Sequence, residues 1–141
     1  MAATLGDRVS CSLKAVGLIW LVSGVVFVLA IRGPNTVIAW VIWGTAVFVV
    51  GWLLVGLPFV ALGDTVLRMS AVPLVLAAGA GGVAVAELPN AIIRILEPAT
   101  HFVWSVRDLI WPGLAFVIAA SSAWLYRILL RSRTAITDDK P

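Results

Sequence analysis

The placement of charged residues constrains this chain more than any other feature of its sequence. The chain has 10 Lys and Arg residues and 7 Asp and Glu residues, and long stretches contain none of them. These stretches are residues 15–31, 33–63, 69–86 and 109–126, with lengths of 17, 31, 18 and 18 residues. A helix needs about 20 mostly apolar residues to cross the hydrocarbon core of a bilayer, and about 17 is the lower limit. The pattern therefore predicts four membrane-spanning helices.

The composition supports this prediction and excludes two other classes of protein. The chain is 62% hydrophobic and 12% charged, whereas a typical soluble domain is about half apolar and about a quarter charged. A disordered chain would instead combine low hydrophobicity with high charge. The length of 141 residues fits a single domain over residues 1–141. The predicted fold class is an all-α integral membrane protein with a four-helix transmembrane bundle.

The turn signals place the expected spans at about residues 15–31, 36–62, 69–86 and 109–126. The turn at residues 32–35, Arg-Gly-Pro-Asn, is so short that the first two helices must be antiparallel neighbours. The second charge-free stretch is too long for one span and too short for two. We expect a single tilted or overhanging helix from Thr36, kinked by Pro58. The first helix is expected to be retained, and cleavage after Ala30 as a signal peptide is the alternative.

The connection between the third and fourth spans has a different pattern. From residue 90 to residue 107, apolar residues recur every three or four positions, and polar residues follow the same spacing on another face. This periodicity predicts an amphipathic helix that lies in the membrane interface. Its polar face is a candidate partner surface, and bracing of the bundle is the alternative role. The candidate surface consists of Arg94, Glu97, His101 and Asp108.

The third span contains an unusual run of small residues. Glycine weakens a helix in water by about 1 kcal/mol relative to alanine, but a membrane offers backbone amides no other partner, so the helix persists. Small residues four positions apart let another helix approach closely. The residues expected to form this packing surface are Ala77, Ala78, Gly81 and Gly82.

The basic residues divide unequally between the two sides of the predicted membrane. With four spans, seven Lys and Arg residues share the side of the termini and three lie on the other side. The positive-inside rule then places both termini in the cytoplasm, in what we expect to be a bacterial inner membrane. Arg127, Arg131 and Arg133 are expected to contact anionic lipid, and residues 132–141 form a polar tail.

No motif in the sequence indicates catalysis or a bound cofactor. The chain has one histidine, His101, and one cysteine, Cys11. A structural zinc site needs about four ligands, mostly Cys and His, so we expect no metal. A single cysteine also excludes an internal disulfide. Outside the apolar stretches, and apart from the short tail after Tyr126, there is no basic patch with interleaved aromatic residues, so we expect no nucleic-acid binding. Because the sequence also lacks a catalytic motif, we expect no enzymatic activity.

Two functional interpretations remain open. The first is a small non-catalytic membrane protein that acts through helix packing, as an accessory or scaffold subunit or as a homo-oligomer, with lipid and another membrane protein as partners. The alternative is a small channel or facilitator-type transporter that functions as an oligomer. A pore needs a stripe of hydroxyls or glycines at helical spacing, and Ser121 and Ser122 are adjacent, which weighs against it.

Overall fold

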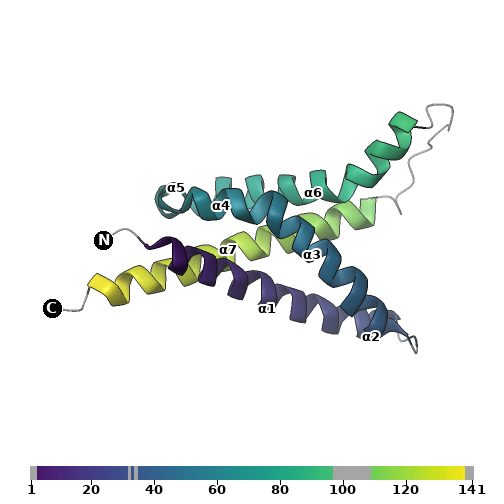
Figure 1. Cartoon of the computed structure of the whole chain (residues 1–141), viewed down its shortest axis with the longest axis horizontal. Helices are drawn as coiled ribbons and strands as arrows, with labels where there is room; N and C mark the ends of the chain where they lie inside the picture. The colour runs from purple at the N-terminus through teal and green to yellow at the C-terminus, as the bar shows by residue number, and fades with distance from the viewer. Residues whose placement is uncertain (1–2, 32, 34, 97–108, 139–141) are drawn as a thin grey trace.

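The computed structural model describes residues 3–31, 33, 35–96 and 109–138. These residues form helices joined by short turns, with no strand among them (Figure 1). Four helical stretches are long and apolar enough to cross a membrane, as the charge pattern predicts. They are Leu5–Ala30, Thr36–Ala61, Ala71–Leu88 and Ile110–Ala135. The first lies within α1 (Leu5–Ile31), the third within α6 (Ala71–Leu96) and the fourth within α7 (Ile110–Asp138).

The second long helix is continuous but changes its winding twice. It consists of α2 (Thr36–Ala39), η1 (Trp40–Gly44), α3 (Thr45–Gly51), η2 (Trp52–Gly56) and α4 (Leu57–Ala61), where η1 and η2 are π-helical turns.

Pro58 follows η2 directly. Proline has no N–H to donate and its ring crowds the preceding turn, which a wider π turn accommodates. Figure 1 shows the chain bending between α3 and α4. The prediction of one long helix from Thr36 is therefore confirmed, whereas the kink at Pro58 stays a prediction.

A short helix, α5 (Gly63–Arg68), connects the second long helix to α6. Leu62 leaves the helical conformation, with φ of −90° and ψ of 23°, and thereby separates α4 from α5. Asp64 lies in the first turn of α5 and Arg68 in its last turn. Each charge opposes the partial charge of its helix end, which stabilises this single-turn element. The sequence analysis assigned no helix to these residues.

The third long helix extends further than the sequence analysis expected. Residues 90–96 were predicted to begin a separate interfacial helix, but α6 runs without interruption to Leu96. Within it, Asn90 Nδ2 donates to the carboxylate of Glu87 at 3.1 Å. Pro89 lacks an N–H, and Figure 1 shows α6 bending in its C-terminal part instead of breaking. Residues 97–107 of the predicted interfacial helix lie outside the described residues.

The fourth long helix also continues beyond its expected end. Residues 132–138, assigned to a polar tail, belong to α7. No Pro or Gly occurs between residues 114 and 138, so nothing in the sequence breaks the helix there. The hydroxyls of Ser132 and Thr134 donate to the carbonyls of Leu129 and Arg131, each at 2.9 Å, so these polar side chains are satisfied within the helix.

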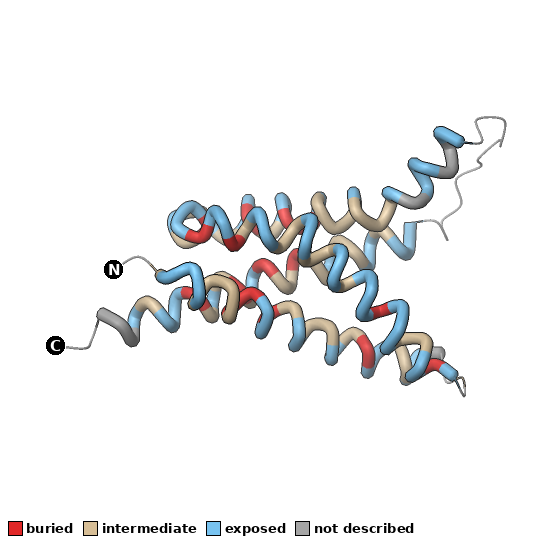
Figure 2. Tube along the Cα trace, viewed as in Figure 1, coloured by how far each residue is buried: buried red, intermediate tan, exposed pale blue. Residues whose placement is uncertain are grey.

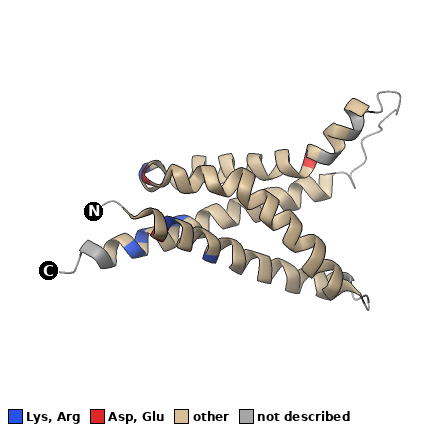
Figure 3. Cartoon of the chain, viewed as in Figure 1, with Lys and Arg blue, Asp and Glu red and all other residues tan. Residues whose placement is uncertain are grey.

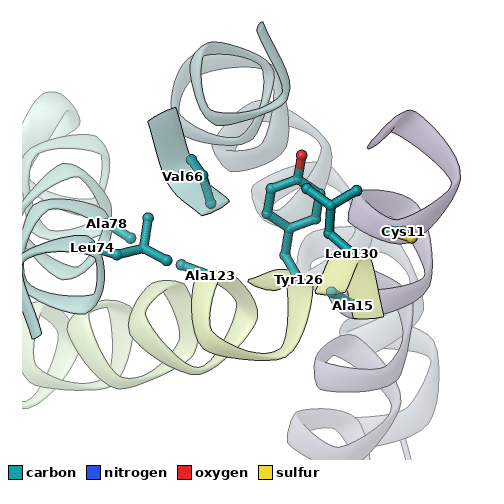
Figure 4. Packing of buried hydrophobic residues seen from close by; sticks show 8 residues of the cluster. All are labelled: Cys11, Ala15, Val66, Leu74, Ala78, Ala123, Tyr126 and Leu130. Carbon is teal, nitrogen blue, oxygen red and sulfur yellow. The ribbon is translucent and has the colours of Figure 1, made fainter. Parts of the chain in front are cut away.

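The four long helices pack most tightly at one end of the molecule. α7 packs along α6 and against α1, and the buried residues concentrate near both termini and α5 (Figures 1 and 2). Toward the opposite end, α1 with α2 and α6 with α7 diverge (Figure 1). The apolar core therefore occupies one end of the bundle. It consists of Cys11, Ala15, Val66, Leu74, Ala78, Ala123, Tyr126 and Leu130 (Figure 4).

The first two long helices are in contact near their connecting turn, as predicted. The ring of Trp40 lies 6.4 Å from that of Trp20 and 5.1 Å from that of Phe27, measured between centroids. Gly24 is buried beneath Trp40, and a side chain at this position would overlap the indole. The missing side chain thus lets the aromatic cluster form between α1 and η1.

Candidate functional site

The Lys and Arg residues whose side chains the structure describes belong to the N-terminal half of α1, to α5 and to the C-terminal half of α7, which lie at the same end of the molecule (Figure 3). We call this the basic end. Among the acidic residues whose side chains the structure describes, Asp7 and Asp64 accompany these cations. The cations are Arg8, Lys14, Arg68, Arg127, Arg131 and Arg133. The excess of positive charge makes this end the first place to look for an interaction with an anionic partner.

An ion pair ties α1 to α5 at the basic end. Arg8 Nη2 lies 2.7 Å from Asp64 Oδ1, and the two side chains are 12% and 55% exposed. Arg8 Nε also donates to the carbonyl of Ala3 at 3.0 Å. The Arg8 side chain passes directly over Gly63, where an added Cβ would lie 2.6 Å from Arg8 Cδ. Glycine at this position therefore gives the arginine room to reach Asp64.

Two reactive side chain types, Tyr126 and Cys11, lie in the core beneath this ion pair (Figure 4). Each is 3% exposed. The Tyr126 hydroxyl has no hydrogen-bond partner among the described residues, and the Cys11 thiol is free. No group of three or more His, Cys, Asp or Glu residues in the described part of the chain could hold a metal ion. Cys11 and Tyr126 are thus packed within the cluster of buried apolar residues.

Two arginines of α7 bind the backbone of the connection between α5 and α6. Arg127 Nη2 donates to the Met69 carbonyl at 2.6 Å, and Arg131 Nη2 donates to the Leu67 carbonyl at 3.3 Å. Carbonyl groups at the C-terminal end of a helix lack intrahelical partners, and cationic side chains satisfy them well. Of the residues expected to contact anionic lipid, two therefore also have a structural role.

A further polar contact joins the first two long helices. Trp52 Nε1 donates to Ser12 Oγ at 2.9 Å, and Ser12 is 4% exposed. Trp52 is the first residue of the π turn η2, so the altered winding and the hydrogen bond occur at the same place. The sequence analysis did not identify this pair, because neither spacing nor composition shows that the two residues meet.

The small residues of α6 form close contacts with two neighbours. A Cβ added to Gly82 would lie 2.6 Å from Ala119 Cβ and 2.7 Å from the Ala115 carbonyl oxygen, both on α7. A Cβ added to Gly81 would lie 3.1 Å from Val55 on η2. The two adjacent glycines thus face different helices.

The remaining small residues of α6 divide between the inside and the outside of the bundle. Ala78 is buried, whereas Ala77 is exposed. Gly79, which the sequence analysis did not single out, is buried, and a side chain there would overlap the Phe116 ring. Ala77 and Ala78 each lie four positions before a glycine, so the spacing alone does not show which of the two alanines is buried.

The candidate partner surface is mostly outside the described residues. Arg94 belongs to α6, and Glu97, His101 and Asp108 fall in the stretch that the structure does not describe. The partner surface therefore stays a prediction from the sequence.

No protein-family model, no curated protein and no solved structure matches this chain.

Proposed function

We propose that this chain is a non-catalytic, four-span protein of a bacterial inner membrane that acts through helix packing, as an accessory or scaffold subunit or as a homo-oligomer. Both termini lie in the cytoplasm with the basic end. Its partners are lipid and another membrane-embedded helix, supplied by a second copy or by a different subunit.

The observation that carries this proposal is the one-sided packing of the bundle. The core lies near the basic end, while Val25, Val26, Val47 and Val117 on α1, α3 and α7 each expose more than half of their surface. Because little of the apolar surface of these helices is buried within the chain, long helix faces remain available to lipid and to partner helices.

The charge distribution supports the proposed orientation. The described cations of the basic end outnumber its two carboxylates, and short cytoplasmic loops carry an excess of Lys and Arg. Arg127, Arg131 and Arg133 would then lie near the anionic cytoplasmic leaflet, which attracts basic residues with about 1 kcal/mol each.

The hydroxyl groups of the fourth helix support packing over conduction. Ser122 Oγ donates to the Ile118 carbonyl of its own helix at 2.8 Å, so the proton of this hydroxyl is already used within α7. In a membrane, such a bond satisfies a polar group that has no water available.

Native mass spectrometry of the full chain in detergent tests the proposal. We expect a defined complex, either a homo-oligomer of fixed copy number or a fixed ratio with one co-expressed subunit. Liposomes that contain the purified chain should show no ion or solute flux above empty liposomes. A strictly monomeric chain, or a flux that scales with the amount of reconstituted chain, would contradict the packing role and favour the channel or facilitator.

The sequence-derived partner surface is a second element of this proposal. Replacing Arg94, Glu97 and His101 together with alanine should leave thermal stability in detergent nearly unchanged and abolish the complex. A triple variant that loses stability but keeps its complex would assign these residues a bracing role instead.

A further inference from the structure

Three arginines belong to the segments that come together where α5 ends and α6 begins. Arg127 and Arg131, from α7, donate to the carbonyls of Met69 and Leu67. Arg68 lies between these two acceptors in the chain, in the last turn of α5, and its side chain is exposed. We call Arg68, Arg127 and Arg131 the arginine corner.

The arginine corner has more hydrogen-bond donors than its neighbours use. A guanidinium group carries five N–H donors, and the hydrogen bonds of Arg127 and Arg131 to the Met69 and Leu67 carbonyls use one nitrogen of each arginine. Arg127 Nε is buried without a hydrogen-bond partner in the described chain, so it is not one of the donors that a ligand can reach from outside. Asp64 pairs with Arg8, and no described carboxylate pairs with the arginine corner. A phosphate group, with several acceptor oxygens and negative charge, matches such a set of donors.

An exposed apolar stripe continues from the arginine corner along α7. Ile128, Trp124 and Val117 lie three, seven and fourteen positions before Arg131, which places all of them on one face of the helix. Their side chains are 43%, 53% and 59% exposed. A free phosphate ion has no contact to make with this stripe, whereas the acyl chain of a phospholipid does. Tryptophan is also enriched where acyl chains meet headgroups.

We propose that the arginine corner binds the phosphate of an anionic phospholipid, with an acyl chain along Ile128, Trp124 and Val117. This inference rests on the proposed orientation, in which the basic end faces the cytoplasmic headgroups. It differs from diffuse attraction, because backbone carbonyls already position two of the three guanidinium groups. Less side-chain freedom is then lost on binding.

Native mass spectrometry of the full chain in detergent, titrated with phosphatidylglycerol, tests the proposal. The unmodified chain should bind one phosphatidylglycerol more tightly than phosphatidylcholine. The variant R68Q/R131Q should bind it about 25-fold less tightly, since each basic residue near an anionic headgroup contributes about a fivefold change in affinity. The variant R68Q keeps both backbone contacts of α7 and should lose about fivefold, so the test stands even where the double variant folds poorly.

The variant K14Q/R133Q is the charge-matched control, because it removes two cations from the same end but outside the arginine corner. In about 0.5 M salt the Debye length is about 4 Å, so this control should stay within about twofold of the unmodified chain. Equal losses in both double variants, or equal binding of phosphatidylcholine, would overturn the site. Competition by inorganic phosphate at an affinity equal to that of the lipid would overturn its assignment to lipid. Lipid binding is measured in detergent, where the chain has no orientation relative to a membrane. A failure to bind phosphatidylglycerol can therefore be distinguished from an error in the proposed orientation.

Discussion

Arg8 and Asp64, 56 positions apart in the sequence, form a 2.7 Å ion pair that joins the beginning of α1 to α5. Gly63 makes this contact possible, because the Arg8 side chain occupies the space that any larger residue would need. The pair thus fixes the N-terminal part of α1 against the connection between the second and third long helices, directly above the buried core.

Replacing Asp64 with Asn should lower the free energy of unfolding in detergent by about 1 kcal/mol, the upper end of values for partly exposed ion pairs. Salt at about 1 M should reduce the difference in unfolding free energy between the variant and the unmodified chain, because it screens the Arg8–Asp64 ion pair. A double-mutant cycle with Arg8→Gln isolates the pair. Glu87→Gln, which removes a carboxylate bonded within its own helix, is the control and should change stability less. A coupling near zero would contradict a contribution of the ion pair to stability, and would mean that Arg8 and Asp64 act independently of each other.

Substitution of Gly82 by Ala should destabilise the chain by about 1–3 kcal/mol, since overpacking at a close helix contact forces the helices apart. The added Cβ would meet the backbone of Ala115, which cannot rotate away. Gly81→Ala should be milder, because its neighbour is the Val55 side chain. Gly17 has no neighbour within 4 Å and serves as the control, where Ala should be neutral or slightly stabilising. Thermal unfolding in detergent measures how strongly each of the three substitutions destabilises the chain. Equal effects at Gly82, Gly81 and Gly17 would contradict the packing of α6 on α7.

Removing the acceptor of the Trp52 indole by Ser12→Ala should cost about 0.6 kcal/mol, the average for hydrogen bonds between membrane helices. The cycle with Trp52→Phe should show that the two effects are not additive. Ser23→Ala, on the same helix and half-buried, is the matched control and should be close to neutral. Additive effects of the Ser12 and Trp52 substitutions would mean that the 2.9 Å contact contributes no stability.

The long helices were predictable from the sequence because hydropathy and charge are local properties. The winding of the second long helix was not, although each π turn begins with Trp and ends with Gly. The overlap of a Cβ at Gly44 with Trp40, and of one at Gly56 with Trp52, shows why the glycines matter there. The extension of α6 past Pro89 was missed, since proline predicts a helix boundary and the helix bends instead.

The candidate site was predictable only in part. The cations of α7 are visible in the sequence as a cluster, but their bonds to the carbonyls of Leu67 and Met69 depend on α5, a helix too short for periodicity to reveal. Only the structure shows that Arg127 and Arg131 bind the carbonyls on either side of Arg68. The Arg8–Asp64 pair depends on contacts between distant segments, which a single sequence does not encode in any local pattern.

The central claim is that the apolar helices span the membrane with the basic end in the cytoplasm, and topology reporters test it most directly. One reporter is fused after Pro141 and another is inserted in the turn at residues 33–35, in otherwise identical full-length chains. We predict that the fusion after Pro141 reports the cytoplasm and that the insertion reports the opposite side. Reporters on the same side, or a C-terminal reporter outside the cytoplasm, would contradict the account.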